Sequence, residues 1–265
     1  NLGLRIDYPI LDETPPLARD SSVGSFEEVF GLTNTNTLDG NYVVQPRVGF
    51  NYALNEDRTL QLRGGGGLFF GTAPHVWISS IYVNNGNSQE SYYASVSQTP
   101  AFSADPFNPP VPEAVNSRVN VDLIDEGFEM PSEWKSNIAF DWQLLGNMAF
   151  TIEAAFSWTN KDIHYIHENL KPAINFLTGS SQIADGRTEY DNAQARSRES
   201  GYRDVIRLTN TEKGYSRQVT SRLQGSFWEG SLDYDLGYTY TRAKNVNDGL
   251  ASSAYANWTN NVGFD

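Results

Sequence analysis

Strict alternation of apolar and polar residues, in seven separate segments, is the feature that most constrains the fold of this chain. In the fifth segment, for example, the apolar Phe150 and Ile152 flank the polar Thr151. Successive side chains of a β-strand point to opposite sides of a sheet, so the pattern predicts strands with one apolar and one polar face. The segments cover residues of about 1–9, 46–55, 58–70, 133–144, 147–160, 212–227 and 231–243.

Short turns and long loops alternate between these segments. The turns lie near residues 55–58, 145–147 and 228–230, and the loops span about 10–45, 71–132, 161–211 and 244–265. In an antiparallel sheet, all the turns then lie at one end and all the long loops at the other. Bacterial outer-membrane barrels have short periplasmic turns and long outer loops. We therefore predict an all-β fold, a transmembrane antiparallel β-barrel with long extracellular loops in the outer membrane of a Gram-negative bacterium.

The apolar face has the composition expected for contact with lipid. Aromatic residues make up 13% of the chain, and several lie near segment ends, where interfacial rings gather in membrane barrels. These are Tyr8, Trp142, Trp158, Tyr215, Phe227, Trp228 and Tyr240. The charges on this face, such as Arg217 and Arg242, occur at segment ends, where long side chains reach the interface. A soluble β-sandwich, the main alternative, would have a chiefly aliphatic inner face.

The opposite face carries charges of both signs, which suits a water-filled lumen or contact with a plug. The residues expected there are Arg5, Asp7, Arg47, Arg63, Asp141, Glu153, Arg222, Asp233 and Asp235. Seven strands do not close a barrel with an even strand number, and open edges are not stable in lipid. We expect the remaining strands to come from a longer polypeptide or from other chains.

Composition and motifs argue against an enzyme or a nucleic-acid-binding protein. The net charge of −13 disfavours phosphate backbones, and the absence of Cys excludes thiolate chemistry. The glycine run 64–67 lacks the Lys-Ser/Thr of a phosphate-binding loop and predicts a strand bend or a close backbone approach. His164 and His167 do not match a zinc motif, and the pair Asp233 and Asp235 lacks an apolar pocket.

The long loops contain two groups of residues that suggest ligand binding. Aromatic side chains that stack on a sugar or peptide, or pack within the loop, are Trp77, Tyr82, Tyr92, Tyr93 and Tyr190. Carboxylates that make Ca²⁺ binding chemically feasible, without an EF-hand spacing, are Asp20, Asp105, Glu113, Asp122, Asp125, Glu126 and Asp248. We expect no catalytic residue, no resident cofactor and no metal site, and treat solvated acidic loops as the default. The proline-rich stretch 106–112 predicts a stiff, extended segment.

Several stretches resemble one family, the Oar-like TonB-dependent outer-membrane receptors. They are Pro46–Phe50 (PRVGF), Leu62–Gly71 (LRGGGGLFFG) continuing to Trp77, Leu208–Thr211 (LTNT), Gly214–Ser216 (GYS), Tyr238–Lys244 (YTYTRAK), Asn247–Gly249 (NDG) and Ser252–Trp258 (SSAYANW). The resemblance implies a 22-stranded barrel with an N-terminal plug, of which this chain supplies strands from the middle to the later part.

The same resemblance implies a function, namely energised uptake or gated passage of a large solute. The implied partners are outer-membrane lipid, the protein's own plug domain, TonB, and a surface lipoprotein or partner chain. Three alternatives remain open: a passive porin, a scaffold or secretion barrel, and a soluble secreted adhesive β-protein.

Overall fold

The structure, a computed structural model, describes residues 1–71, 75–89, 97, 99–110, 118–144, 146–171, 198–246 and 251–260. The elements in chain order are β1 (Leu2–Asp7), α1 (Phe26–Phe30), β2 (Val43–Ala53), β3 (Leu60–Phe70), α2 (Val76–Val83), β4 (Val119–Ile124), β5 (Ser132–Gln143), β6 (Ala149–His167), β7 (Tyr202–Thr211), β8 (Tyr215–Phe227), a 3-10 turn (Trp228–Gly230), β9 (Leu232–Lys244) and α3 (Ala254–Asn260). Among the described helices, none is long and apolar enough to cross a membrane.

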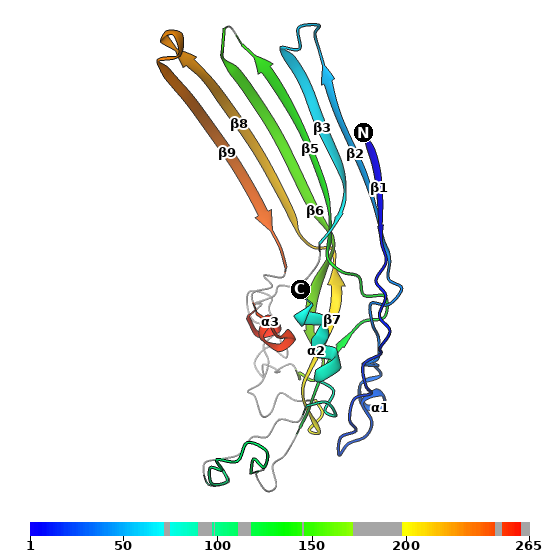
Figure 1. The fold of residues 1–265 in the computed structure, drawn as a ribbon. Coiled ribbons are helices and arrows are strands. Elements are labelled where there is room, and N and C mark those ends of the chain that lie inside the picture. The colour runs from blue at the N-terminus through cyan, green and yellow to red at the C-terminus, as the bar shows by residue number, and fades with distance from the viewer. Residues whose placement is uncertain are drawn as a thin grey trace, which may run out of the picture.

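Seven strands form an antiparallel main sheet in the order β1-β2-β3-β5-β6-β8-β9. Tight turns join β2 to β3, β5 to β6 and β8 to β9 at one end of the sheet, and the long connections leave from the other end (Figure 1). Within the described residues, β1 and β9 each pair with a single strand. The predicted antiparallel sheet is therefore confirmed, but these strands do not close into a barrel by themselves.

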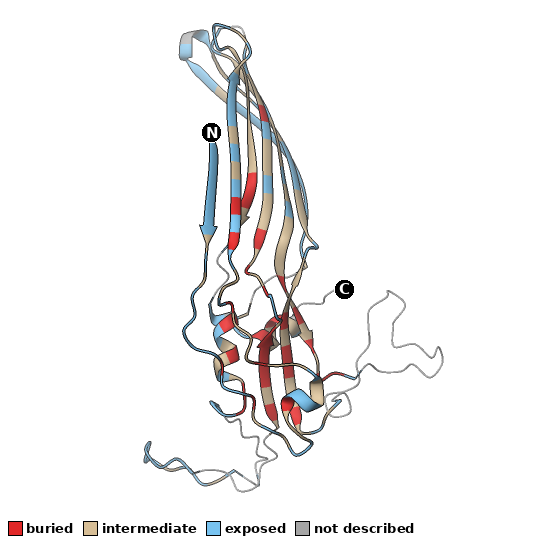
Figure 2. Cartoon of the chain, turned by 90° about the vertical axis from the view of Figure 1, so that its right-hand side faces the viewer, coloured by how far each residue is buried: buried red, intermediate tan, exposed pale blue. Residues whose placement is uncertain are grey.

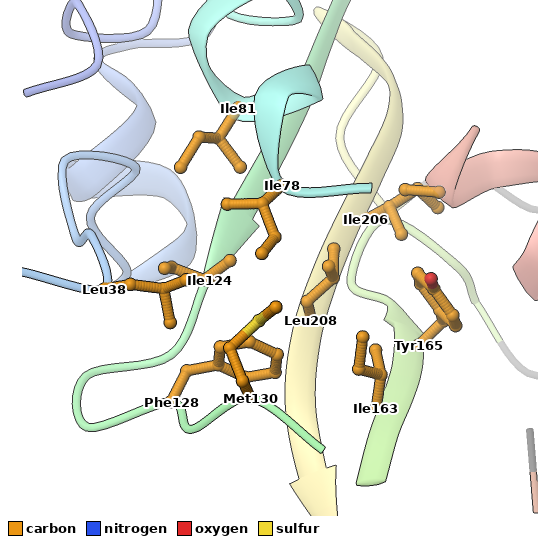
Figure 3. Close-up of a cluster of buried hydrophobic side chains, with 11 residues drawn as sticks. Leu38, Ile78, Ile81, Ile124, Phe128, Met130, Ile163, Tyr165, Ile206 and Leu208 are labelled. Carbon is orange, nitrogen blue, oxygen red and sulfur yellow. The ribbon is translucent and has the colours of Figure 1, made fainter. Parts of the chain in front are cut away.

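At the loop end, the chain folds into a cap, which we define as α1, α2, α3, β4, β7, the end of β6 and the described residues next to these elements. Residues 149–158 of β6 pair with β8, whereas residues 162–167 pair with β7, which in turn pairs with β4 in parallel. Buried residues concentrate in the cap, and few occur in the main sheet (Figure 2). One of two hydrophobic clusters there brings β4, β6 and β7 together around Ile124, Ile163 and Leu208 (Figure 3).

Strands β4 and β7 lie within the segments 71–132 and 161–211 that the alternation assigns to loops. β4 is buried on both faces, with Val121, Leu123 and Ile124 almost inaccessible to solvent. The run Val119–Leu123 (VNVDL) does alternate, but it is shorter than the seven predicted segments, and its polar Asp122 is buried as well. The helices are a second departure from the all-β expectation. The short α1 begins with a capping box, in which Ser25 and Glu28 bond to each other's backbone N–H.

The glycine run occupies the middle of β3, where neighbouring backbones come very close. A Cβ atom on Gly64 would lie 2.7 Å from the carbonyl oxygen of Asn137 on β5, and one on Gly65 would lie 2.6 Å from that of Val48 on β2. Contacts this short exclude any side chain, so the run permits a close approach of three strands.

Candidate functional site

A cluster of charged side chains lies in the middle of the polar face of the main sheet. In the strand register, Arg63 of β3 is level with Ala139 of β5 and Glu153 of β6. The small side chain of Ala139 lets the Arg63 guanidinium reach across β5, so that its Nη2 lies 3.4 Å from Glu153 Oε2. The Nε of Arg63 donates to Asp141 Oδ2 at 2.8 Å. One arginine therefore neutralises two carboxylates from neighbouring strands.

Two neutral side chains complete this group, which we call the wall cluster (Arg63, Asn137, Asp141, Thr151 and Glu153). Asn137 donates to Glu153 Oε1 at 2.9 Å, and Thr151 donates to Asp141 Oδ1 at 2.8 Å. The Arg63 side chain remains 39% exposed, so water and salt screen these ion pairs. The cluster can therefore hold a fixed pattern of charge on a wet surface, which suits contact with a polar solute or a polar protein surface.

A second ion pair lies on the same face, between β8 and β9. Arg222 donates through Nε to Asp235 Oδ1 at 2.8 Å and through Nη2 to the other carboxylate oxygen. This bidentate geometry is the strongest form of an arginine–carboxylate pair, although both side chains are about half exposed. Asp233 lies one pleat further toward the turn, level with Ser226.

A third group surrounds Gln45, close to the loop end of β2. Its side-chain nitrogen donates to Asp7, and its oxygen accepts from Arg47 Nη2 and from the Phe70 backbone N–H, both at 3.1 Å. Arg5 pairs with Asp7 at 2.8 Å. Gln45 is fully buried and connects three strands, yet sequence reasoning missed it because it placed residues 10–45 in a loop. Extending the alternation back to Val43 would have identified it.

The strand register places all nine charged residues predicted for the polar face on one side of the main sheet. It brings Arg63, Asp141 and Glu153 into direct contact and pairs Arg222 with Asp235. A cavity of about 320 Å³ also borders this face, at the point where β6 leaves β8 for β7. Its lining includes the carboxylates of Glu133 and Asp162. Burial raises the pKa of Asp162, and the charge of Glu133 acts in the same direction.

The other face of the main sheet exposes large apolar side chains. Tyr52, Leu236 and Tyr238 are 63%, 64% and 68% exposed, and Trp142 and Trp158 are exposed as well. A soluble protein rarely leaves an apolar surface of this extent uncovered. The sheet therefore separates an apolar surface from a charged one, as a membrane barrel wall does.

The predicted loop residues have varied positions. Tyr82 of α2 packs against the hydrophobic cluster around Ile124, and its hydroxyl donates to the carbonyl oxygen of Glu13 at 2.9 Å. Trp77 lies in α2, but its side chain is outside the described part, and Tyr92, Tyr93 and Tyr190 lie outside the described residues altogether.

The acidic loop residues that the structure describes have protein partners in several cases. Asp125 accepts two bonds from Arg207 at 2.8 and 3.0 Å, Asp122 accepts from Asn84, and Asp105 accepts from the Phe107 backbone. Glu113 and Asp248 lie outside the described residues. In the described part of the chain, no group of three or more His, Asp or Glu side chains is arranged to hold a metal ion.

Taken together, an exposed apolar face, a charged face and antiparallel strands joined by short turns define the wall of a transmembrane β-barrel. A family model described as outer membrane beta barrel domain matches residues 18–264. The chain belongs to this family and is located in the bacterial outer membrane. This result confirms the predicted location and excludes a soluble secreted protein. No curated protein sequence gives a significant match to the chain.

Proposed function

We propose that this chain forms part of the wall of a TonB-dependent transporter of the Oar-like kind. The complete protein takes up, or gates the passage of, a solute too large for a porin. The stretches 46–50 and 62–71, which resemble that family, support the proposal. They lie on β2 and β3, next to the wall cluster.

The observation that carries the proposal is the open, charged wall. β1 and β9 each have a free edge among the described residues, and a sheet edge does not persist in lipid. We infer that more strands complete the barrel and that its lumen is wide. A lumen of that width needs a plug to prevent leakage, and the wall cluster offers fixed charges of both signs for a plug to contact.

Charge reversal in the wall cluster tests this contact. In the wild type, Arg63 neutralises two carboxylates. In Arg63→Glu, three carboxylates face one another instead, so a plug that docks on this wall is displaced. For the full-length protein in a planar bilayer, we expect little steady conductance for the wild type and frequent large openings for the variant. Uptake of solute by cells should require the proton motive force.

A matched control uses Arg58, at the β2–β3 turn, outside the wall cluster. Arg58 has a φ of 56°, which Asn tolerates well, so Arg58→Asn removes a cation with little strain. This control should behave as the wild type does. A steady large conductance in the wild type, with Arg63→Glu changing ion selectivity alone, would contradict the transporter and favour a porin.

A scaffold or secretion barrel is the second candidate, and the extent of the cap favours it. The cap has two hydrophobic clusters of its own and therefore offers an ordered external surface to a lipoprotein or exported chain. Affinity purification from detergent-solubilised membranes tests this alternative. A stoichiometric partner that is lost on cap deletion, together with solute uptake that continues without the proton motive force, would support it.

A further inference from the structure

Two arginines lie directly opposite each other on the apolar face of the sheet. Arg217 of β8 and Arg242 of β9 are register partners, and Lys244 follows one pleat further toward the cap, opposite Tyr215. All three cations are exposed, and among the described residues none forms an ion pair with a carboxylate. Like charges directly opposite each other destabilise a sheet, so this arrangement indicates an anion supplied from outside the chain.

The position of these cations across the membrane follows from how the apolar surface runs over the sheet. On β1 and β2, exposed apolar side chains continue toward the cap as far as the register partners Ile6 and Val44. On β8 and β9 the apolar surface ends sooner, at the pair Val219–Tyr240, and the arginines begin in the next outward-facing row.

At the turn end of the sheet, β8 and β9 also extend further away from the cap than β3 does. Leu60, at the start of β3, is level with Trp142, and through β6 and β8 with Leu236. β8 and β9 continue beyond that level to the pair Phe227–Leu232.

Both ends of the apolar surface are therefore displaced toward the turns on β8 and β9. Tilted strands explain this displacement, because a membrane plane crosses strands tilted by about 40° obliquely. The two arginines then lie at the boundary of the apolar band on the side of the long loops, which is the outer side. An arginine at the bilayer midplane would cost about 2–4 kcal/mol, and at the boundary this cost falls to about 0–1 kcal/mol.

Aromatic side chains lie in the register row next to the two arginines, on the side of the cap. Tyr215 shares a row with Trp158 of β6 and Trp134 of β5, as in an interfacial girdle. The Arg217 guanidinium carbon lies 5.1 Å from the centre of the Tyr215 ring. A guanidinium over an aromatic face keeps the N–H groups at its edge available, and these match the oxygens of a phosphate.

We propose that Arg217 and Arg242 form a binding site for the phosphate groups of the glycolipid in the outer leaflet. The two arginines face lipid at head-group depth, on the outer side, where a phosphorylated sugar head group presents at least one negative charge. Lys244 lies one row closer to the cap and lines the cavity that contains Glu133 and Asp162. The site depends on the membership of the chain in the outer-membrane family and on the tilt of its strands. It is independent of the transport proposed above.

Thermal unfolding of the full-length protein in detergent, with added lipid, tests the site. Diphosphorylated lipid A should raise the Tm of the wild type, and dephosphorylated lipid A should raise it much less. The double variant Arg217→Gln and Arg242→Gln should lose most of the difference between the two lipids. Inorganic phosphate at the same concentration should have no effect, because it lacks the acyl chains that bring the charge to this surface.

Lys135→Gln serves as a matched control, because Lys135 lies on the polar face, level with Ser157 and one residue from the Arg217 row. This variant should keep the response of the wild type to diphosphorylated lipid A. Equal stabilisation by both lipids, or an unchanged response in the double variant, would overturn the proposal. The second result would indicate that a carboxylate outside this chain neutralises the arginines. A matching shift with inorganic phosphate would indicate a general anion site and would also overturn it.

Discussion

At Gly65 the main sheet has no room for a methyl group. A Cβ atom there would lie 2.6 Å from the Val48 carbonyl oxygen and 3.2 Å from the Gly49 Cα. We expect Gly65→Ala to push β2 away from β3 and to lower the free energy of unfolding by about 1–3 kcal/mol. The measurement is the denaturant dependence of unfolding in detergent micelles.

Gly49→Ala provides the control, since Gly49 is the register partner of Gly65 on β2. Its Cβ would meet nothing closer than 3.8 Å, which is an ordinary contact. This variant should unfold close to the wild type. Equal destabilisation by the two variants would mean that general strand propensity, and not the close approach at Gly65, explains the glycine run.

Asp122, in the cap outside the membrane-spanning strands, makes the cap sensitive to pH. Burial raises the pKa of its carboxyl to about 6, and the negative charge of Asp204 acts in the same direction, against hydrogen bonds from Asn84 and Ser80. Asp204 in turn contacts His167, whose Nε2 lies 3.3 Å from Asp204 Oδ1. Because the pKa is higher in the folded state than in the unfolded state, protonation of Asp122 stabilises the fold. This contribution is complete below about pH 4 and disappears as the pH rises through 6.

Because the pKa of Asp122 rises from an ordinary value near 3.8 to about 6, the free energy of unfolding falls by about 3 kcal/mol over this pH range. Amide hydrogen exchange in β4, corrected for intrinsic rates, should therefore show weaker protection at pH 7.5 than at pH 4.5. Asp122→Asn should abolish this dependence, and Asp105→Asn, at an exposed turn, should keep it. Protection in the wild type that does not change with pH would contradict the assignment.

At the scale of the elements, the alternation predicted the strands of the main sheet and missed the two strands β4 and β7 of the cap. β2, β3, β5, β8 and β9 all carry the predicted period of two. β4 alternates only over Val119–Leu123, and β7 has the charged Asp204 between the apolar Tyr202 and Ile206, so neither strand gives a long pattern of period two. The parallel pairing of these two strands, about eighty residues apart in sequence, has no local signal.

β6 shows how one extra residue hides the end of a strand. Glu133 pairs with Thr159, but the preceding residue of β5, Ser132, pairs with Lys161, so β6 has a bulge at Asn160. The apolar positions change from even numbers, as in Phe156 and Trp158, to odd numbers, as in Ile163. A fixed alternation therefore ends at residue 160, whereas the strand continues to His167.

Asn169 joins the end of β6 to the start of β7. It is fully buried, its side-chain oxygen accepts from the Glu199 N–H at 2.8 Å, and its amide nitrogen donates to the carbonyls of Glu199, Tyr202 and Arg203. Asn169→Ala leaves these backbone groups unsatisfied, at a cost of about 1–3 kcal/mol for a buried polar group.

We expect Asn169→Ala to increase proteolysis within the cap, with the main sheet remaining protected in detergent. Limited proteolysis followed by mass spectrometry locates the cleavage sites. Asn51→Ala, on the exposed part of β2, is the control and should not change the pattern. Cleavage that increases equally in the main sheet would show that the cap and the sheet unfold together.

At the scale of the whole molecule, the sequence specified the two faces but could not specify the closure. The charged residues of the wall cluster were predicted for one face, yet their contacts depend on which strands are neighbours. Arg63 reaches Glu153 only because β3, β5 and β6 are adjacent and in register. The partners of β1 and β9 do not appear in the described strands, so the number of strands in the barrel stays a proposal.

Strand tilt gives a prediction for the molecule as a whole. The chain has no Cys, so single cysteines can carry spin labels without a background from this region. Val48 of β2 and Arg217 of β8 share one register row, four strand steps apart. With strands about 4.8 Å apart and tilted by about 40°, each step changes depth by roughly 3 Å, so the two positions should differ by about 12 Å.

A label at Val48→Cys should thus lie deep in hydrocarbon and respond to dissolved oxygen, whereas a label at Arg217→Cys should lie at the head groups and respond to a water-soluble nickel complex. Phe156→Cys, in the same row on β6, should be intermediate. A label at Thr151→Cys, on the polar face of β6 next to Ile152, is the control for the face of the sheet. It should lie away from lipid. Equal depths for Val48 and Arg217 would mean that the rows run parallel to the membrane. The arginine pair would then lie within the hydrocarbon, and its assignment to lipid phosphate would be wrong.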